Sequence, residues 1–192
     1  YDLSFCFTYK HYKIHIYMFS ISPKTYGKFN DIPQNQIYGE IAYTDFIMLI
    51  HEAPIIVNSI LDIGSGCGTI LFHAAQDISS LDYLLGVENH RYRFDKSILL
   101  LEQQHESIQE KVEFICDDFQ NISFSQTDMV YCCNTMFDTC QNKELIDKCL
   151  HECKGVFVLF TLEPKCLPYF LKTFWVTTSW TNKVRVFMYA KL

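Results

Sequence analysis

The sequence predicts an α/β fold: a Rossmann-like, mostly parallel sheet of seven strands, with helices on both faces and a C-terminal antiparallel hairpin. Three observations indicate this fold. Apolar runs of strand length alternate with amphipathic helical patterns between residues 56 and 160. The glycine-rich turn "GSGCG" (64–68) follows the first of these runs. The last two apolar runs are joined only by the turn "TNK" (181–183), which leaves no room for a crossover helix.

The order of these elements divides the chain into two regions. Residues 1–36 are interpreted as an N-terminal extension, with a hairpin over 3–19 and an irregular connector over 22–36. Residues 37–192 are interpreted as one domain. Its expected helices cover residues 39–53, 68–78, 93–107 and 142–153. Its expected strands cover residues 56–63, 82–88, 111–116, 128–133, 155–160, 174–180 and 184–192.

The charge balance limits the classes of partner. The net charge is −6 at pH 7, so we expect no global attraction to anionic membranes and no strong direct binding of nucleic acid. Two local basic clusters lie at residues 10–13 and 183–185. No apolar run approaches the roughly 18–20 residues of a membrane span, and residues 1–20 do not resemble a signal peptide. We therefore expect an intracellular location, nuclear or cytoplasmic, in a host cell if the source is viral.

The chain contains nine cysteines, many for its length. An odd number without a secretory leader favours reduced thiols over a disulfide framework. The densest group, from Cys132 to Cys153, contains no CxxC pair. Because structural zinc sites usually contain such pairs, we predict no metal site.

The glycine turn after the first strand predicts a ligand site. Gly64, Gly66 and Gly68 follow Asp62 in a GxGxG pattern, whereas dinucleotide sites use GxGxxG. A carboxylate beside the turn would repel a pyrophosphate but would favour an ammonium group or hydroxyls. S-adenosylmethionine fits these conditions, since it carries a sulfonium and an amino-acid tail and no phosphate. The turn therefore favours S-adenosylmethionine as the cofactor.

Polar residues at the next strand ends support this hypothesis. Glu88 ends the second strand, where it can accept hydrogen bonds from both ribose hydroxyls. Asp118 follows the third strand, beside the adenine amino group, with Phe119 stacked on the ring. Asn134 ends the fourth strand at the edge of the same crevice. Each also has a structural alternative, as a solvated strand end, a turn former or a helix cap, but the three in register with the glycine turn favour a site.

Longer stretches resemble known families. Together, "LDIGSGCG", "GVE" and "DDF" resemble class I S-adenosylmethionine-dependent methyltransferases across residues 39–192. "IYGEIAYTDFIMLI" (37–50) and "SWTNKVRVFMY" (179–189) resemble the Dot-type (disruptor of telomeric silencing) histone lysine methyltransferases, which lack a SET domain. "VYCCNTMF" (130–137) is similar to the fourth-strand motif of the same family. The resemblance implies that residues 37–192 form a class I methyltransferase domain.

The Dot-type resemblance also implies roles for single residues. The cofactor-binding residues would be Tyr38, Glu40, Asp62, Gly64, Gly66, Thr69, Glu88, Asp118, Phe119 and Asn134. The catalytic residues, in or beside an acceptor channel with Phe137, would be Asn134, Tyr38 and Phe187. The implied partner is a protein with an accessible lysine, such as a histone or nucleosome. Aromatic walls would align and desolvate the attacking amine, without a dedicated general base.

Other functions remain open beside protein lysine methylation. Phe187 lacks the hydroxyl of the tyrosine expected there, and the chain lacks the long basic segments of nucleosome-binding members. The alternatives are a methyltransferase of small molecules or other non-histone acceptors, and an inactive methyltransferase fold that serves as a binding protein. An adenine methyltransferase would show [DN]PP[YF] where this chain has "CCNTMF", and a cytosine-C5 enzyme would need a nucleophilic cysteine after a proline.

Overall fold

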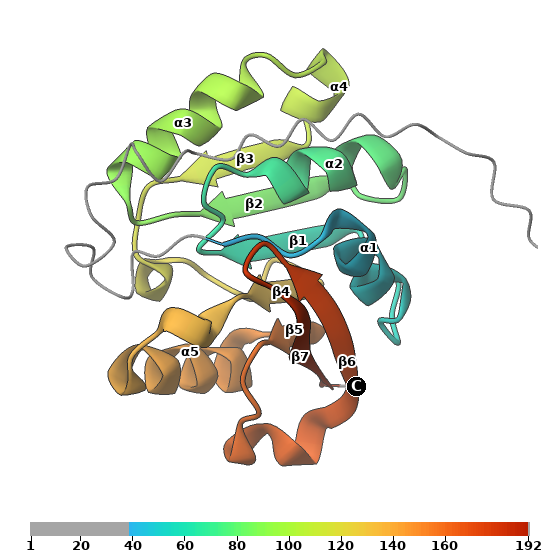
Figure 1. The fold of residues 1–192 in the computed structure, drawn as a ribbon, viewed down its shortest axis with the longest axis vertical. Coiled ribbons are helices and arrows are strands. Elements are labelled where there is room, and N and C mark those ends of the chain that lie inside the picture. The colour runs from blue at the N-terminus through green and yellow to red at the C-terminus, as the bar shows by residue number, and fades with distance from the viewer. Residues whose placement is uncertain (1–38, 192) are drawn as a thin grey trace, which may run out of the picture. The chain divides into compact units, whose positions relative to one another are not determined.

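A computed structural model describes residues 39–191 of the chain. These residues contain one seven-stranded sheet with the strand order β3-β2-β1-β4-β5-β7-β6, so the predicted fold class is confirmed (Figure 1). The strands are β1 (Ser59–Ile63), β2 (Tyr83–Val87), β3 (Val112–Ile115), β4 (Met129–Cys132), β5 (Val156–Leu159), β6 (Phe170–Thr178) and β7 (Thr181–Ala190). The predicted hairpin over 3–19 and connector over 22–36 lie outside the described residues.

Helices precede and connect these strands. The α-helices are α1 (Tyr43–His51), α2 (Thr69–Asp77), α3 (Arg91–Leu101), α4 (Glu106–Gln109) and α5 (Thr139–Glu152). The 3-10 helices are η4 (Phe119–Asn121), η5 (Asn134–Met136) and η6 (Pro164–Tyr169). None of the helices within residues 39–191 is long and apolar enough to cross a membrane.

The sheet places its ligand-binding crevice beside β1. Strands β1 to β5 run parallel, and β1 pairs with β2 on one side and with β4 on the other. The chain therefore leaves β1 in one direction along the sheet and returns to the other side of β1 at β4. Such a reversal opens a crevice at the carboxyl ends of the two strands, because the connections on either side diverge.

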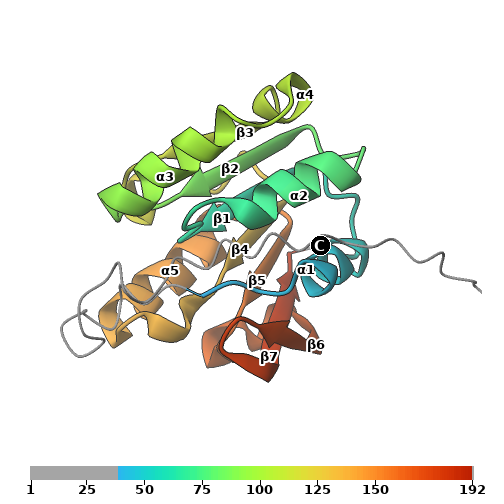
Figure 2. The same cartoon turned by 45° about the horizontal axis from the view of Figure 1, so that its top comes forward.

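Helices cover both faces of the sheet, as predicted (Figure 2). Side chains of α1, α2 and α4, including Phe46, Leu71 and Ile108, pack in one apolar cluster with alternate residues of the strands. On the other face, Leu145 and Ile146 of α5 pack in a second cluster. Both faces of the parallel strands are therefore buried, which explains their nearly continuous apolar sequences.

The C-terminal hairpin is confirmed and has a specific order. β7 pairs antiparallel with β5 and with β6, so β6 forms the edge of the sheet. Phe187 lies opposite Leu159, the last residue of β5. The residues of β7 before Phe187, and the turn that precedes them, therefore extend beyond the carboxyl edge of β5.

The helix expected over 39–53 covers only Tyr43–His51, and two further helices differ from the prediction for local reasons. The single helix expected over 93–107 is two helices, α3 and α4; the second starts where His105 Nδ1 accepts the Ser107 N–H at 3.3 Å. The helix expected from residue 142 starts at Thr139. Asp138 and Gln141 form a reciprocal capping box there, with distances of 2.8 and 3.0 Å, which stabilises the earlier start.

Candidate functional site

A cavity of about 370 Å³ lies at the carboxyl ends of the parallel strands, within the size range of small-molecule sites. One end is formed by residues after β2 and β3, and the other by residues after β4 together with the β6–β7 turn. The lining residues are Gly39, Ile63, Gly64, Val87, Glu88, Asn89, Arg93, Asp117, Phe119, Cys133, Thr135, Met136, Phe137, Gln141 and Trp180. Of the predicted site residues, Gly64, Glu88 and Phe119 line it, and so does Phe137 of the predicted channel.

The glycine turn adopts a backbone that favours glycine at three positions. Gly64, Gly66 and Gly68 have φ values of 76°, 59° and 78°. A Cβ on Gly64 would meet open space, so this glycine borders the cavity, as predicted. A Cβ on Gly68 would instead lie 2.1 Å from Phe114 Cζ. Gly68 is therefore required for packing of the turn on β3, whereas Gly64 leaves room for a ligand.

The amide groups of this turn point into the protein. Gly64 and Ser65 donate their N–H groups to Val87 O at 2.8 and 3.1 Å, and Gly68 donates to Ser65 O at 2.9 Å. Gly66 donates to Glu88 Oε2 at 2.9 Å. Phosphate-binding turns offer such N–H groups to the ligand. Four of the five N–H groups of this turn are used internally, so it offers few donors to a pyrophosphate.

Glu88 is held by three donors at the end of β2. Oε2 accepts the Gly66 N–H, and Oε1 accepts the His90 N–H at 2.8 Å and Arg93 Nη2 at 3.0 Å. The Glu88 and Arg93 side chains are only 4% and 6% exposed, so this is a buried ion pair. A carboxylate has about four acceptor positions, so one on Oε2 remains for a ligand. Glu88 can therefore accept one hydrogen bond from a ligand, and its predicted bonds with both ribose hydroxyls stay a prediction.

Asp62 is buried directly before the turn and does not line the cavity. Burial, together with the smaller effect of the nearby charges of Glu88 and Glu40, raises the pKa of this carboxyl to about 8. Asp62 therefore carries a proton at neutral pH in the absence of a cation. A ligand that brings positive charge near these acids would favour the ionised form.

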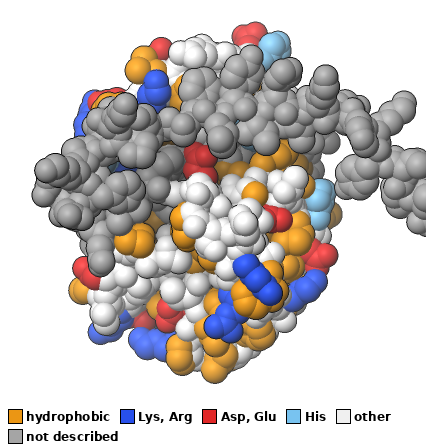
Figure 3. All heavy atoms as spheres, in the orientation of Figure 1, with side chains coloured by type: hydrophobic (Ala, Val, Ile, Leu, Met, Phe, Trp, Pro, Cys, Tyr) orange, Lys and Arg blue, Asp and Glu red, His pale blue; other side chains and the backbone are white. Residues whose placement is uncertain are grey.

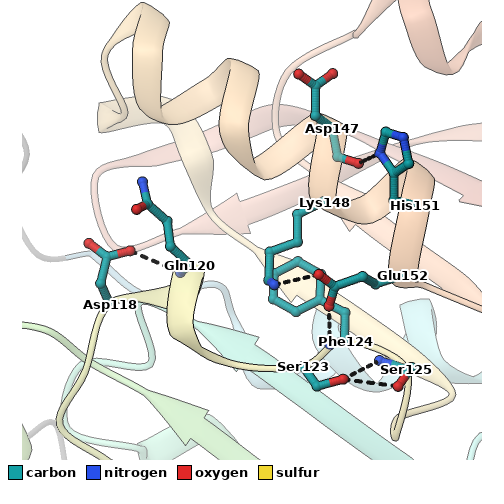
Figure 4. A network of polar contacts seen from close by, with 9 residues as sticks. All are labelled: Asp118, Gln120, Ser123, Phe124, Ser125, Asp147, Lys148, His151 and Glu152. Atoms are coloured by element: carbon teal, nitrogen blue, oxygen red, sulfur yellow. Dashed lines mark hydrogen bonds and ion pairs between the residues drawn. The ribbon is translucent and has the colours of Figure 1, made fainter.

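Two aspartates follow β3 and have different positions. Asp118 Oδ1 accepts the Gln120 N–H at 3.0 Å and caps η4, as Figure 4 shows. Asp117, which the sequence did not indicate as a site residue, lines the cavity and accepts hydrogen bonds from Asp118 N and Asn121 Nδ2. Those bonds lower the pKa of Asp117. A role for Asp118 at adenine stays a prediction, and Asp117 is the carboxylate that faces the cavity.

The segment after η4 is fixed to helix α5. Glu152 Oε2 accepts the Phe124 N–H at 3.0 Å, and Lys148 donates to Glu152 Oε1 at 2.6 Å while its Nζ lies 5.0 Å from the centre of the Phe124 ring (Figure 4). These contacts anchor the connection between β3 and β4. Phe119, at the start of η4, is thereby held with its ring stacked on Phe137 at 5.8 Å.

Asn134 occupies a different place from the one predicted. Its side chain is fully buried and does not line the cavity. Nδ2 donates to Asn142 Oδ1 and Thr161 Oγ1 at 2.8 and 2.6 Å, and Oδ1 accepts the Phe160 N–H at 2.8 Å. The amide therefore joins the end of β4 to α5 and to the end of β5. Its neighbours, residues 133 and 135–137, line the cavity instead.

The other predicted residues lie around the cavity or away from it. Phe187 is buried in the apolar cluster beneath α5 and does not line the cavity, because it faces the sheet core opposite Leu159. Thr69 is the first residue of α2 and is also outside the lining. Tyr38 lies outside the described residues.

Trp180 is a cavity residue that sequence reasoning did not single out. It lies in the β6–β7 turn, and a Cβ on Gly39 would come within 2.3 Å of its ring. Ser179 N donates to Glu40 O at 2.8 Å, and Glu40 N donates to Ser179 Oγ at 3.1 Å. The segment at residues 39–40 is therefore joined to the hairpin turn. The stretches "IYGE" and "SWT" both resemble the same family, but no sequence pattern predicts that they contact each other.

Cys133 contributes a thiol to the cavity wall. Burial raises the pKa of this thiol, although hydrogen bonds from Thr135 oppose the shift. A protonated thiol is a weak nucleophile. The cavity therefore lacks an activated cysteine at this position, in agreement with the sequence argument against a cytosine-C5 mechanism.

The fold is similar to that of methyltransferases. No family model and no curated protein matches the sequence. A bacterial Hen1 methyltransferase domain matches with a TM-score of 0.62 and 9% identity over 78% of this chain and 97% of that one. Magnesium protoporphyrin IX methyltransferase from Synechocystis PCC 6803, with bound SAM, gives 0.58 and 11% over 77% and 76%. The [4+2]-cyclase SpnF gives 0.50 and 15% over 60% and 43%. The chain thus has the Rossmann-like methyltransferase fold, a fold that a cyclase also adopts.

Replacing Asn134 tests its structural role. We expect Asn134→Ala to lower the free energy of unfolding by at least about 2 kcal/mol, because the Phe160 N–H and the polar groups of Asn142 and Thr161 lose a buried partner. Urea denaturation measures this change. The neighbouring control Thr135→Ala, at an exposed position, should change it by less than about 0.5 kcal/mol. Equal stability of both variants would contradict the role.

The raised pKa of Asp62 predicts a pH-dependent stability difference. The folded state binds more protons than the unfolded state between about pH 4 and pH 8, so the free energy of unfolding falls there by about 1.4 kcal/mol per pH unit for this group. Asp62→Asn removes that loss. Its stability relative to wild type should therefore increase from pH 5 to pH 8 in urea denaturation. Exposed Asp82→Asn should show no such trend, and a pH-independent difference for Asp62→Asn would refute the assignment.

Proposed function

We propose that this protein is an S-adenosylmethionine-dependent methyltransferase whose cofactor occupies the cavity beside β1 and β2. The observation that carries the proposal is that Gly64 and Glu88 border the same cavity. Gly64 offers open space at a positive φ, and Glu88 presents one unused acceptor position in the same cavity. The methyltransferase fold supports this assignment, as does a neighbour of that fold with bound SAM.

The residues present fit this cofactor better than a dinucleotide. Four of the five turn amides donate to groups within the protein, which disfavours a phosphate site there. The cluster of Glu40, Asp62 and Glu88 favours a ligand with positive charge, and S-adenosylmethionine carries a sulfonium and an ammonium group. We call the part of the cavity formed by residues after β1, β2 and β3 the cofactor half. In this half, Phe119 provides an apolar surface for adenine, and Asp117 faces the same space.

The remaining part of the cavity, formed by residues after β4 and by the β6–β7 turn, suits the methyl acceptor, and we call it the acceptor half. When bound, the cofactor supplies an electrophilic methyl group. Met136, Phe137 and Trp180 form apolar walls there, and Thr135 and Gln141 add polar groups. These walls would exclude water and align the acceptor for in-line attack. Within residues 39–191, the charged lining residues are Glu88, Arg93 and Asp117, all after β2 and β3, so the acceptor half favours an uncharged, apolar reacting group.

Protein lysine methylation is the second candidate. One observation favours it: the two stretches that resemble Dot-type enzymes, at Glu40 and Ser179, are hydrogen-bonded to each other at the edge of the cavity. Against it, Phe187 does not line the cavity, and the methyltransferases matched in fold are not described by a lysine acceptor. A small-molecule or other non-histone acceptor is therefore the first candidate.

Calorimetric titration with S-adenosylhomocysteine tests the cofactor assignment. We expect wild type to bind it, and Gly64→Asn to weaken binding at least tenfold, because the new side chain enters the cavity. Asparagine tolerates positive φ, so the melting temperature should change little. Ser79→Ala, at an exposed position, is the control. Unchanged affinity in Gly64→Asn would refute the location, and no binding by wild type would refute the proposed cofactor.

Arg93 is expected to position Glu88 for the ribose. Arg93→Lys keeps the positive charge but loses the planar guanidinium group, so Glu88 should be less firmly held. We expect the affinity for S-adenosylhomocysteine to fall severalfold and the affinity for its 2′-deoxy analogue to fall less. Calorimetry with both ligands measures the ratio. An equal loss for both would indicate that Arg93 only supports the fold.

A further inference from the structure

The outer part of the C-terminal hairpin carries an exposed aromatic and basic surface. Trp175 on β6 lies opposite Arg185 on β7, and its side chain is 56% exposed. Lys183 Nζ lies 4.5 Å from the centre of a Trp175 ring, and Arg185 Cζ lies 5.9 Å from it. Figure 3 shows Lys and Arg side chains against hydrophobic ones over this hairpin. We call Trp175, Lys183 and Arg185 the hairpin patch.

The two cations of the patch are not neutralised by acids. Within residues 39–191, the ion pairs involve other lysines and arginines, and neither Lys183 nor Arg185 takes part in one. The chain as a whole carries a net charge of −6. Two unpaired cations side by side in an acidic protein form a local positive site, and at physiological salt the distant acids are screened beyond about 8 Å. The patch therefore favours an anionic partner.

The position of the patch connects it to the cavity. Residues 183 and 185 precede Phe187, which lies level with the end of β5, so the patch extends beyond the carboxyl edge of the parallel strands. Trp180, in the turn of the same hairpin, lines the cavity. From the Trp175–Arg185 pair to the turn the strands advance by about 10 Å. A partner bound on the patch is thus close to the acceptor half of the cavity.

We propose that the hairpin patch binds single-stranded nucleic acid, with a base on Trp175 and phosphates on Lys183 and Arg185. Exposed tryptophan combined with basic side chains is the chemistry that recognises single strands. The Lys183–Trp175 contact does not oppose this, since an exposed cation–π pair is weaker than a base stacked on tryptophan. The proposed binding surface is inferred only from the contacts among Trp175, Lys183 and Arg185. That the bound strand is also the methyl acceptor rests on the proposed function.

An acidic peptide is the competing occupant, and the patch favours it less. Carboxylates would use the two cations but would leave the indole of Trp175 without a planar partner. A nucleotide uses all three side chains together, because each repeat contains both a phosphate and a ring. The expectation from net charge, that the chain has no strong attraction to nucleic acid, concerns the whole molecule. The patch predicts local and salt-sensitive binding.

Tryptophan fluorescence provides a reporter of binding at the hairpin patch. Its two tryptophans, Trp175 and Trp180, are both on this hairpin, so Trp180→Phe leaves Trp175 as the single tryptophan. We would titrate this variant with oligouridine and, in a separate arm, oligothymidine of about twelve nucleotides, a length within the usual site size. Quenching of Trp175 fluorescence is expected in at least one arm. The two arms distinguish RNA from DNA as the preferred strand.

Charge variants identify the binding surface. In anisotropy titrations of the same labelled strands, Lys183→Gln with Arg185→Gln should weaken binding at least tenfold and reduce the salt slope by about 1.4, or 0.7 for each lost phosphate contact. The matched control is Lys111→Gln with Lys154→Gln, which removes the same charge just before β3 and β5, at the amino ends of these parallel strands. It should retain wild-type affinity and slope.

Three results would overturn the proposal: no binding of either strand by wild type, equal weakening in both double variants, or equally tight binding of a labelled poly-glutamate peptide. Calorimetry with S-adenosylhomocysteine is run on the same preparations. Because the patch residues do not line the cavity, both double variants should bind this ligand like wild type. Loss of nucleic-acid binding with cofactor binding retained therefore tests the patch separately from the proposed function.

Discussion

The arrangement of the site depends on one buried carboxylate. Glu88 lies at the end of β2, and its oxygens bind the Gly66 N–H, the His90 N–H and Arg93. An unpaired charge at 3% exposure would be strongly unfavourable, so all three donors are needed together. The interaction therefore fixes the turn after β1, the start of α3 and the end of β2 relative to one another. The cavity is formed where these three segments meet.

The same carboxylate determines which charge the cavity favours. Glu88 is balanced by Arg93, but Glu40 adds negative charge nearby, and Asp62, buried beside both acids, keeps its proton up to about pH 8. A phosphate would meet these acids and few turn amides, whereas a cationic ligand would relieve the repulsion. The sequence argument placed a negative charge beside the turn at Asp62. In the structure the carboxylate beside the turn is Glu88, which pairs with Arg93, whereas Asp62 is protonated at neutral pH.

Regular elements were predictable because their signals are local, and side-chain directions were not. Strand and helix periods, the glycine turn and the short "TNK" connection determine the topology. Gly64 and Glu88, two of the predicted cofactor-binding residues, both line the cavity, since the ends of neighbouring parallel strands converge. Asn134 and Phe187 point into the protein, a direction that depends on pairing with β5 and packing beneath α5. Arg93 was missed because its partner is defined only once α3 is placed.

Trp180 shows why this end of the cavity was the hardest part to predict from the sequence. The cavity wall at Trp180 is made by two segments about 140 residues apart, which are joined by the two hydrogen bonds between Glu40 and Ser179. Contacts of such long range leave no periodic signal in the sequence. They also belong to the hairpin and the segment before α1, outside the parallel strands. The hairpin can therefore change without altering Glu88, and a shared fold at 9–15% identity does not determine what this end of the cavity binds.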